Sequence, residues 1–156
     1  MLLRLGFLFL SAVGFSQSGK HYVKYHDASG RMMEEGWMLQ DEKTDYWFTY
    51  FPDGSIKSKG AYTEDQKNGY WYFYNTDATL IKEGHYKNGL AVSWWIFYKP
   101  NGISEKIQFE HGNREGYALI YKNGKLFKAE HYKNDNLTGS WTSLYQFKKD
   151  NPNARF

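Results

Sequence analysis

Residues 69–89 read GYWYFYNTDATLIKEGHYKNG, and this stretch carries a complete β-hairpin signal. Residues 70–74 are aromatic without a break, which predicts a first strand. Residues 75–78 are rich in turn formers, and residues 80–86 predict a return strand that ends in a further tyrosine. Because no apolar pattern of helical period follows residue 16, we expect an all-β fold.

The hairpin signal repeats along the chain about every 24 residues. Tyrosines mark the repeat at spacings of 25, 24, 24, 23 and 24 residues, at Tyr25, Tyr50, Tyr74, Tyr98, Tyr121 and Tyr145. Tryptophans lie three or four residues before four of them, at Trp47, Trp71, Trp95 and Trp141. A second series runs in phase with the first, at Met38, Tyr62, Tyr86, Phe109 and Tyr132. Such periodicity indicates that one small unit stacks on the next.

The expected corners carry residues that suit tight turns. Hairpin turns are predicted at Asp53-Gly54, Asn101-Gly102 and Asn123-Gly124. Connections between copies are predicted at Asn68-Gly69, Asn88-Gly89, His111-Gly112 and Asn134-Asp135. Because side chains alternate across a strand, Tyr70, Tyr72 and Tyr74 share one face, and Trp71 lies on the other.

These patterns predict an elongated, single-layer antiparallel meander of stacked β-hairpins over residues 17–147. Both faces of each first strand are apolar, so the rings of neighbouring copies must cover one another. A polar tail over residues 148–156 is expected to fray. At 156 residues, the chain is expected to form one repeat domain.

Two phrases, GYWYFY at residues 69–74 and GHYKNG at residues 84–89, resemble MORN repeats. They are closer still to the bacterial variant G-x-W-x-x-Y…G…G-x-Y-x-x-G, over about residues 24–145. Some copies depart from the pattern: Ala78 replaces the turn glycine, Gln108 and Ala129 replace the glycine before the aromatic residue, and Ala118 replaces tryptophan. The resemblance implies an elongated sheet used for protein contacts or membrane attachment, with no catalytic residues. Bacterial members are often labelled antitoxins.

Residues 1–16, MLLRLGFLFLSAVGFS, have the organisation of a secretory signal peptide. Arg4 is the positive charge, and an apolar run follows it. The small residues Gly14 and Ser16 then flank Phe15, as at a signal-peptidase site. Cleavage after Ser16 would leave Gln17 as the first residue. The apolar run is too short to span a membrane, which needs about 20 residues, so no transmembrane segment is expected in the mature chain. We therefore expect export to the periplasm or the medium.

The charge pattern argues against a nucleic-acid partner, because the net charge of +3 is not gathered into a basic stripe. Residues 20–86 carry 8 Lys or Arg against 11 Asp or Glu, a net charge of −3. Residues 87–156 carry 11 against 6, a net charge of +5. This asymmetry fits either a solvated surface or head-to-tail association. The chain has no cysteine, so no disulfide can form.

No catalytic cluster interrupts the repeat, so we expect no enzyme activity, metal site or cofactor. His85 and His131 occupy the same register two copies apart, roughly 19 Å at about 4.8 Å per strand, which is too far to share a metal ion.

The tryptophans Trp47, Trp71, Trp95 and Trp141 are the candidate binding residues. They form either an exposed ladder with a pitch near 10 Å or the core of the single layer. The leading hypothesis is an exported, non-enzymatic protein-binding or scaffolding module in a cell-envelope assembly. The alternatives are an antitoxin or immunity protein that masks a toxin, and a carbohydrate-binding surface that uses the Trp ladder.

Overall fold

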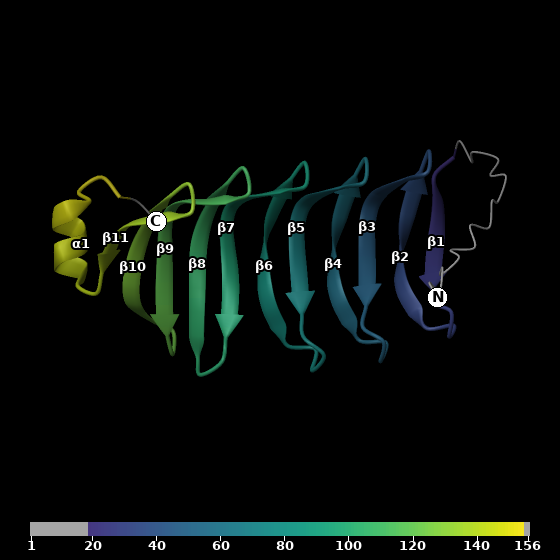
Figure 1. Cartoon of the computed structure of the whole chain (residues 1–156), viewed down its shortest axis with the longest axis horizontal. Coiled ribbons are helices and arrows are strands. Elements are labelled where there is room, and N and C mark those ends of the chain that lie inside the picture. The colour runs from purple at the N-terminus through teal and green to yellow at the C-terminus, as the bar shows by residue number, and fades with distance from the viewer. Residues whose placement is uncertain (1–18, 155–156) are drawn as a thin grey trace, which may run out of the picture.

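The computed structural model describes residues 19–154 as one antiparallel sheet of 11 strands, with neighbouring strands in chain order (Figure 1). The strands are β1 (His21–His26), β2 (Met32–Leu39), β3 (Glu42–Tyr50), β4 (Ile56–Thr63), β5 (Gln66–Tyr74), β6 (Leu80–Lys87), β7 (Leu90–Lys99), β8 (Ile103–Glu110), β9 (Asn113–Lys122), β10 (Lys125–Lys133) and β11 (Asn136–Trp141). A single helix, α1 (Leu144–Asp150), follows them in the described part of the chain. Because the strands lie across the long axis, the molecule is an elongated ribbon, and the predicted single-layer meander is confirmed.

Two-residue turns with positive φ at both positions close many of the hairpins. Six have this geometry: Gln40-Asp41, Glu64-Asp65, Asn88-Gly89, His111-Gly112, Asn123-Gly124 and Asn134-Asp135. This backbone matches the twist of the flanking strands. The turn predicted at Asn68-Gly69 is wrong, because these residues lie inside β5 and the corner falls on Glu64-Asp65.

The positive φ that Asn68-Gly69 favours is used in a bulge instead. It recurs two residues before each tryptophan position, at Asp45, Gly69, Ser93 and Gly116, with φ of 50°, 77°, 60° and 96°. In the first copy Gly36 pairs with Trp47, whereas Trp37 pairs with Thr44, so the register is broken between them. The bulge thus leaves carbonyl groups without strand partners beside each indole.

The buried indoles satisfy these carbonyls. Nε1 of Trp47 donates to the carbonyl of Trp37 at 2.9 Å, and Nε1 of Trp71 donates to that of Ala61 at 2.9 Å. Nε1 of Trp95 donates to the carbonyl of His85 at 3.1 Å. Each indole reaches the residue ten positions earlier, so the bulge and the ring form one repeating unit.

Each indole lies flat against a glycine of the preceding strand. A Cβ built at Gly36, Gly60 or Gly84 would come within 2.3–2.4 Å of the ring carbons of Trp47, Trp71 or Trp95. Rings of the second aromatic series stand edge-on between the indoles, with centroid distances of 5.1 Å for Tyr62–Trp71 and 4.9 Å for Tyr86–Trp95. The single layer therefore builds its core from its own rings.

The fourth copy replaces this glycine–tryptophan pair by a pair of similar total volume. Ala118 stands in the tryptophan position and pairs with Ile107 of β8. Both side chains are buried. Ala118 pairs with Ile107 and Glu130, which therefore stand in the glycine positions of the pattern. The prediction that Gln108 and Ala129 replace these glycines is wrong.

The C-terminal segment differs from the prediction. The last strand, β11, ends at Trp141, and α1 begins at Leu144. Residues 148–150 of the predicted polar tail therefore belong to a helix and do not fray. Ser143 caps the helix by accepting a hydrogen bond from the backbone of Gln146 at 3.4 Å. Phe147 is buried against Leu119 and Ala129. A helix of seven residues is too short to be stable alone, so this contact must hold it.

We expect Gly60→Ala to lower the free energy of unfolding by about 1–3 kcal/mol, the usual cost of overpacking. The new Cβ would lie 2.4 Å from Cδ2 of Trp71. Equilibrium denaturation measures the effect. Gly19→Ala is the control, because no heavy atom lies within 4 Å of that site. Equal stability of the two variants would contradict this account of the core.

Phe147→Ala should release α1 from the sheet, because the helix then loses its one buried side chain. Hydrogen exchange of the amides of residues 144–150 should become at least about tenfold faster, as local opening costs less free energy. Tyr145→Ala serves as the control, since Tyr145 is 79% exposed. Unchanged protection in Phe147→Ala would show that something else holds the helix.

Candidate functional site

The two faces of the ribbon differ in how far they are covered. We call them the tryptophan face, which carries Trp47, Trp71 and Trp95, and the tyrosine face, which carries the side chains one residue to either side. The three indoles are 0%, 0% and 2% exposed. The sequence left open whether these indoles form an exposed ladder or the core of the layer. Their burial shows that they are core, with no ring surface left for a ligand.

Trp141 does not belong to the same series. It pairs with Ala129, and Ala129 pairs with Leu119, so Trp141 lies on the tyrosine face. Its Nε1 donates to Oδ2 of Asp150 at 2.8 Å, beside α1. The four predicted site residues are therefore not brought together: three are core, and the fourth contacts the helix.

A continuous row of directly paired side chains crosses the tyrosine face on all eleven strands. We call it the central row: Lys24, Glu35, Phe48, Lys59, Tyr72, Glu83, Ile96, Lys106, Leu119, Ala129 and Trp141. From β2 to β8 the even strands contribute a charge and the odd strands an aromatic or aliphatic side chain. The row is therefore regular over the seven strands from β2 to β8.

The charges of β2, β4, β6 and β8 alternate in sign. They are Glu35, Lys59, Glu83 and Lys106, and successive members lie two strands apart, about 9.6 Å. Sequence reasoning missed this alternation because it appears only when return strands of different copies are compared in register. A search of positions 24 residues apart for charge as well as for rings could have found it.

The two acidic members are held by tyrosines of the neighbouring strands. Glu83 accepts a hydrogen bond from the hydroxyl of Tyr98 at 2.6 Å, and Glu35 accepts one from Tyr50 at 2.5 Å. The hydrogen bond to Glu83, together with burial, raises the pKa of Tyr98 to about 12. Burial, followed by the charge of Glu83, raises the pKa of Tyr70 to about 12. Each carboxylate is thereby fixed in place.

The two basic members lie over aromatic rings. Nζ of Lys59 is 5.3 Å from the ring centroid of Tyr72 and 5.6 Å from that of Tyr74. Nζ of Lys106 is 4.7 Å from the ring centroid of Trp94. Because the negative face of a ring attracts a cation, these side chains are also held in defined positions.

Part of the tyrosine face is covered and part is open. In the described part of the chain, α1 covers it at β9–β11, where Phe147 packs against Tyr117 with ring centroids 5.6 Å apart. Toward β1 the rings stay half-exposed, with Tyr46 at 40% and Tyr98 at 39%. Figure 1 shows α1 at the C-terminal end only. Residues 150–154 reach Gln108 of β8, and residues 19–154 leave the central row uncovered from β1 to β8.

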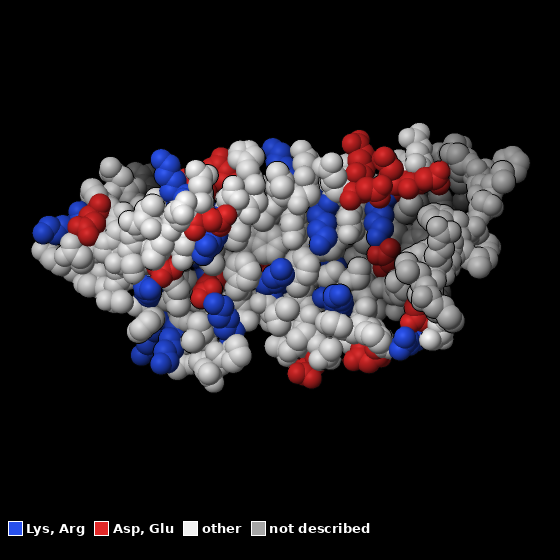
Figure 2. All heavy atoms as spheres, in the orientation of Figure 1, with Lys and Arg blue, Asp and Glu red and all other residues white. Residues whose placement is uncertain are grey.

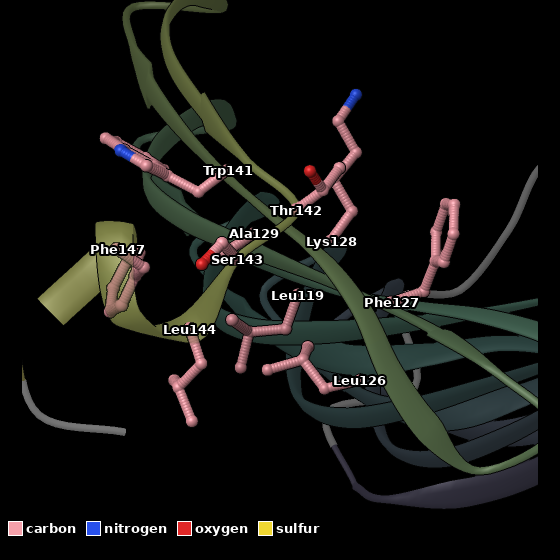
Figure 3. A pocket seen from close by; sticks show the side chains of 10 residues that line it. All are labelled: Leu119, Leu126, Phe127, Lys128, Ala129, Trp141, Thr142, Ser143, Leu144 and Phe147. Atoms are coloured by element: carbon pink, nitrogen blue, oxygen red, sulfur yellow. The ribbon is translucent and has the colours of Figure 1, made fainter.

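Beside the helix lies an apolar notch of about 60 Å³. Figure 3 shows Leu119, Leu126 and Leu144 converging on it, whereas Phe127 points away. Phe127 and Leu144 are 57% and 58% exposed. Lys128 is the one ionisable residue among those that line the notch, which has room for one small apolar side chain.

The charges and histidines elsewhere show no convergent site. Figure 2 shows Lys, Arg, Asp and Glu interspersed along the visible face, with acidic side chains gathered near the turns that follow β2 and β4. His85 packs on Tyr70 at 4.7 Å, and His131 on Tyr117 at 4.9 Å. Within residues 19–154, no group of three or more His, Asp or Glu is placed to hold a metal ion. None of the helical segments in this range has the length and apolar character that crossing a membrane requires.

Comparison with known proteins places no family on this chain: no protein-family model matches it, and neither does any curated protein sequence.

Glu83→Gln should lower the pKa of both Tyr98 and Tyr70, because the charge that favours their protonated forms is removed. Tyr98 should fall further, since its hydrogen bond to Glu83 is the larger cause, whereas burial still raises the pKa of Tyr70. NMR titration of labelled tyrosines measures both. Glu105→Gln is the control, because Glu105 lies on the tryptophan face opposite Phe97.

Tyr98 and Tyr70 make the stability of the fold depend on pH. The folded-state pKa of about 12 lies above the ordinary value of 10, so the associated stability is complete below pH 10 and is lost as the pH rises through about 12. Glu83→Gln should flatten this decline. An unchanged decline, or unchanged tyrosine titration, would contradict the assigned contacts.

Proposed function

We propose that this protein is an exported, non-enzymatic scaffold of the MORN-repeat type that binds protein through its tyrosine face. The chain's own C-terminal segment carries the proposal. Phe147 is 4% exposed on this face, and the hydroxyl of Tyr117 donates to Oδ1 of Asn151 at 3.0 Å. The face thus already buries a helix through one aromatic side chain and a polar contact.

The open stretch over β1–β8 has the features of a recognition surface. Half-exposed tyrosines supply large contact area with little loss of side-chain freedom, and such rings are enriched at protein interfaces. The charges of the central row stand at fixed positions, and fixed charges favour one partner orientation over others. These observations support binding of a defined protein surface.

A non-enzymatic role is favoured by the same geometry. Turnover needs several reactive groups that converge in one cleft. In the central row each charge is held by a neighbouring ring and separated from the next by two strands, about 9.6 Å. The burial of Trp47, Trp71 and Trp95 also weakens the case for carbohydrate stacking on a Trp ladder.

Export is supported by residues 1–16, which lie outside the described residues. The repeat pattern supports the family assignment, because its tryptophan and the glycine of its G-x-Y part form the core contacts, as Trp71 and Gly60 do. In an envelope assembly, a ribbon of this kind would hold partner proteins at fixed spacing along its length.

Affinity purification of the protein from the envelope of its native host tests the proposal. We expect a stoichiometric protein to be recovered, and its yield to fall at least about tenfold in Tyr46→Ala/Tyr98→Ala, which removes two exposed rings of the interface. Leu137→Ala is the control, since Leu137 is even more exposed, at 54%, but lies on β11.

Equal recovery with the double variant, or no stoichiometric protein at all, would count against binding through this face. The mass of the purified chain tests export at the same time. A chain that begins at Gln17 supports removal of the leader, and an intact leader in the soluble fraction of the cytoplasm contradicts it.

A further inference from the structure

We propose that the tyrosine faces of two copies of this chain pack against each other, related by a two-fold axis through Tyr72 of β5. The inference rests on the proposed function, because it names the partner of the same surface. It follows from the central row, whose pattern is complementary to its own reversal. A second copy is therefore the occupant that this face fits.

The alternating charges determine the orientation. When the row is turned end for end about β5, Lys59 of one copy faces Glu83 of the other, and Glu35 faces Lys106. All four facing pairs are then opposite in charge. A parallel, unshifted arrangement would place each charge against its own kind, which costs several kcal/mol across an interface. The sequence of signs therefore selects the antiparallel pair.

The uncharged members of the row match in the same alignment. Phe48 of one copy faces Ile96 of the other, and Tyr72 meets Tyr72 on the axis. Apolar side chains thus meet apolar side chains wherever charges do not face charges. Because a sheet with an apolar face gains stability by packing on a second layer, this arrangement supplies the layer that the single ribbon lacks.

The position of α1 agrees with the same axis. The helix covers the row at β9–β11, so β2–β8 remain for contact, and their middle strand is β5. Two unrelated features, the charge pattern and the helix, therefore define the same centre. In this alignment β1 of each copy lies over β9 of the other, so the helix of one copy abuts β1 of the other and limits a shift along the ribbon.

The contact area is sufficient for a stable dimer. Seven strands span about 34 Å, and eight-residue strands such as β4 span about 26 Å, so the overlap is about 900 Å² per copy. A standard interface buries about 800 Å² per partner. Packed sheets lie about 10 Å apart, a gap that a glutamate and a lysine from opposite sheets can bridge together.

Charge reversal tests the pairing. We expect the wild-type protein to be a dimer in sedimentation equilibrium. Lys59→Glu and Glu83→Lys should each weaken the dimer at least about 100-fold, because each reversal creates two like-charge contacts. An equimolar mixture of the two variants should restore a heterodimer, since every reversed charge then meets its opposite. Lys122→Glu is the control: it makes the same charge change on an exposed side chain next to the β9–β10 turn.

Cross-linking provides a readout that does not depend on the folding of these variants. The chain has no cysteine, so Tyr72→Cys introduces a single thiol on the proposed axis. A short bis-maleimide should link two such chains efficiently, and Thr76→Cys, in the β5–β6 turn, should link far less. Equal cross-linking of the two variants would overturn the axis.

A monomeric wild-type protein, or mixed variants that stay monomeric while folded, would overturn self-association. The proposed function is tested separately from self-association. A monomer that still captures another envelope protein, with the loss in Tyr46→Ala/Tyr98→Ala, keeps the binding face and refutes only the second copy as its partner. Failure of both experiments removes both proposals.

Discussion

The structure depends on the contact between an indole ring and a glycine of the adjacent strand. Gly60 has no side chain, so Trp71 can lie flat on the backbone and be fully buried in a sheet that has no second layer. The bulge at Gly69 turns the ring into this position and exposes the carbonyl that its Nε1 needs. Ring burial, backbone geometry and hydrogen bonding are thus satisfied by one repeating arrangement.

This arrangement makes the two faces unequal. On the tryptophan face the cover comes from the chain itself, because Tyr62 and Tyr86 stand edge-on between the indoles and Lys67 lies 4.6 Å from the ring of Trp71. Over β2–β8 the tyrosine face has no corresponding glycines, so its rings cannot lie flat on the backbone. They remain half-exposed and hold the charges between them. The proposed binding face is therefore the one that the repeat does not cover.

The C-terminal end shows how such a face is completed. The alternation of the central row ends at β10, where Ala129 stands in place of a charge beside Leu119 of β9. This change makes room for Phe147, and a short helix that could not stand alone folds onto the sheet. Where charges replace the small side chains, the complement must itself carry charges in matching positions. A partner of the open part of the face would therefore need charges at the same regular spacing.

The periodic aromatic residues were sufficient to determine the fold, because a period of about 24 residues and turn-forming dipeptides are local properties of the chain. They also determined which strand residues share a face. They could not separate the two uses of Asn68-Gly69, since a positive φ suits a turn and a bulge equally. Only the tertiary structure decided that Trp47, Trp71 and Trp95 are core, that Trp141 and α1 lie on the opposite face, and that charges from four return strands form one alternating row. The physical reason is that burial and registry are properties of neighbouring strands, and the pairing that creates them brings together residues about two dozen positions apart.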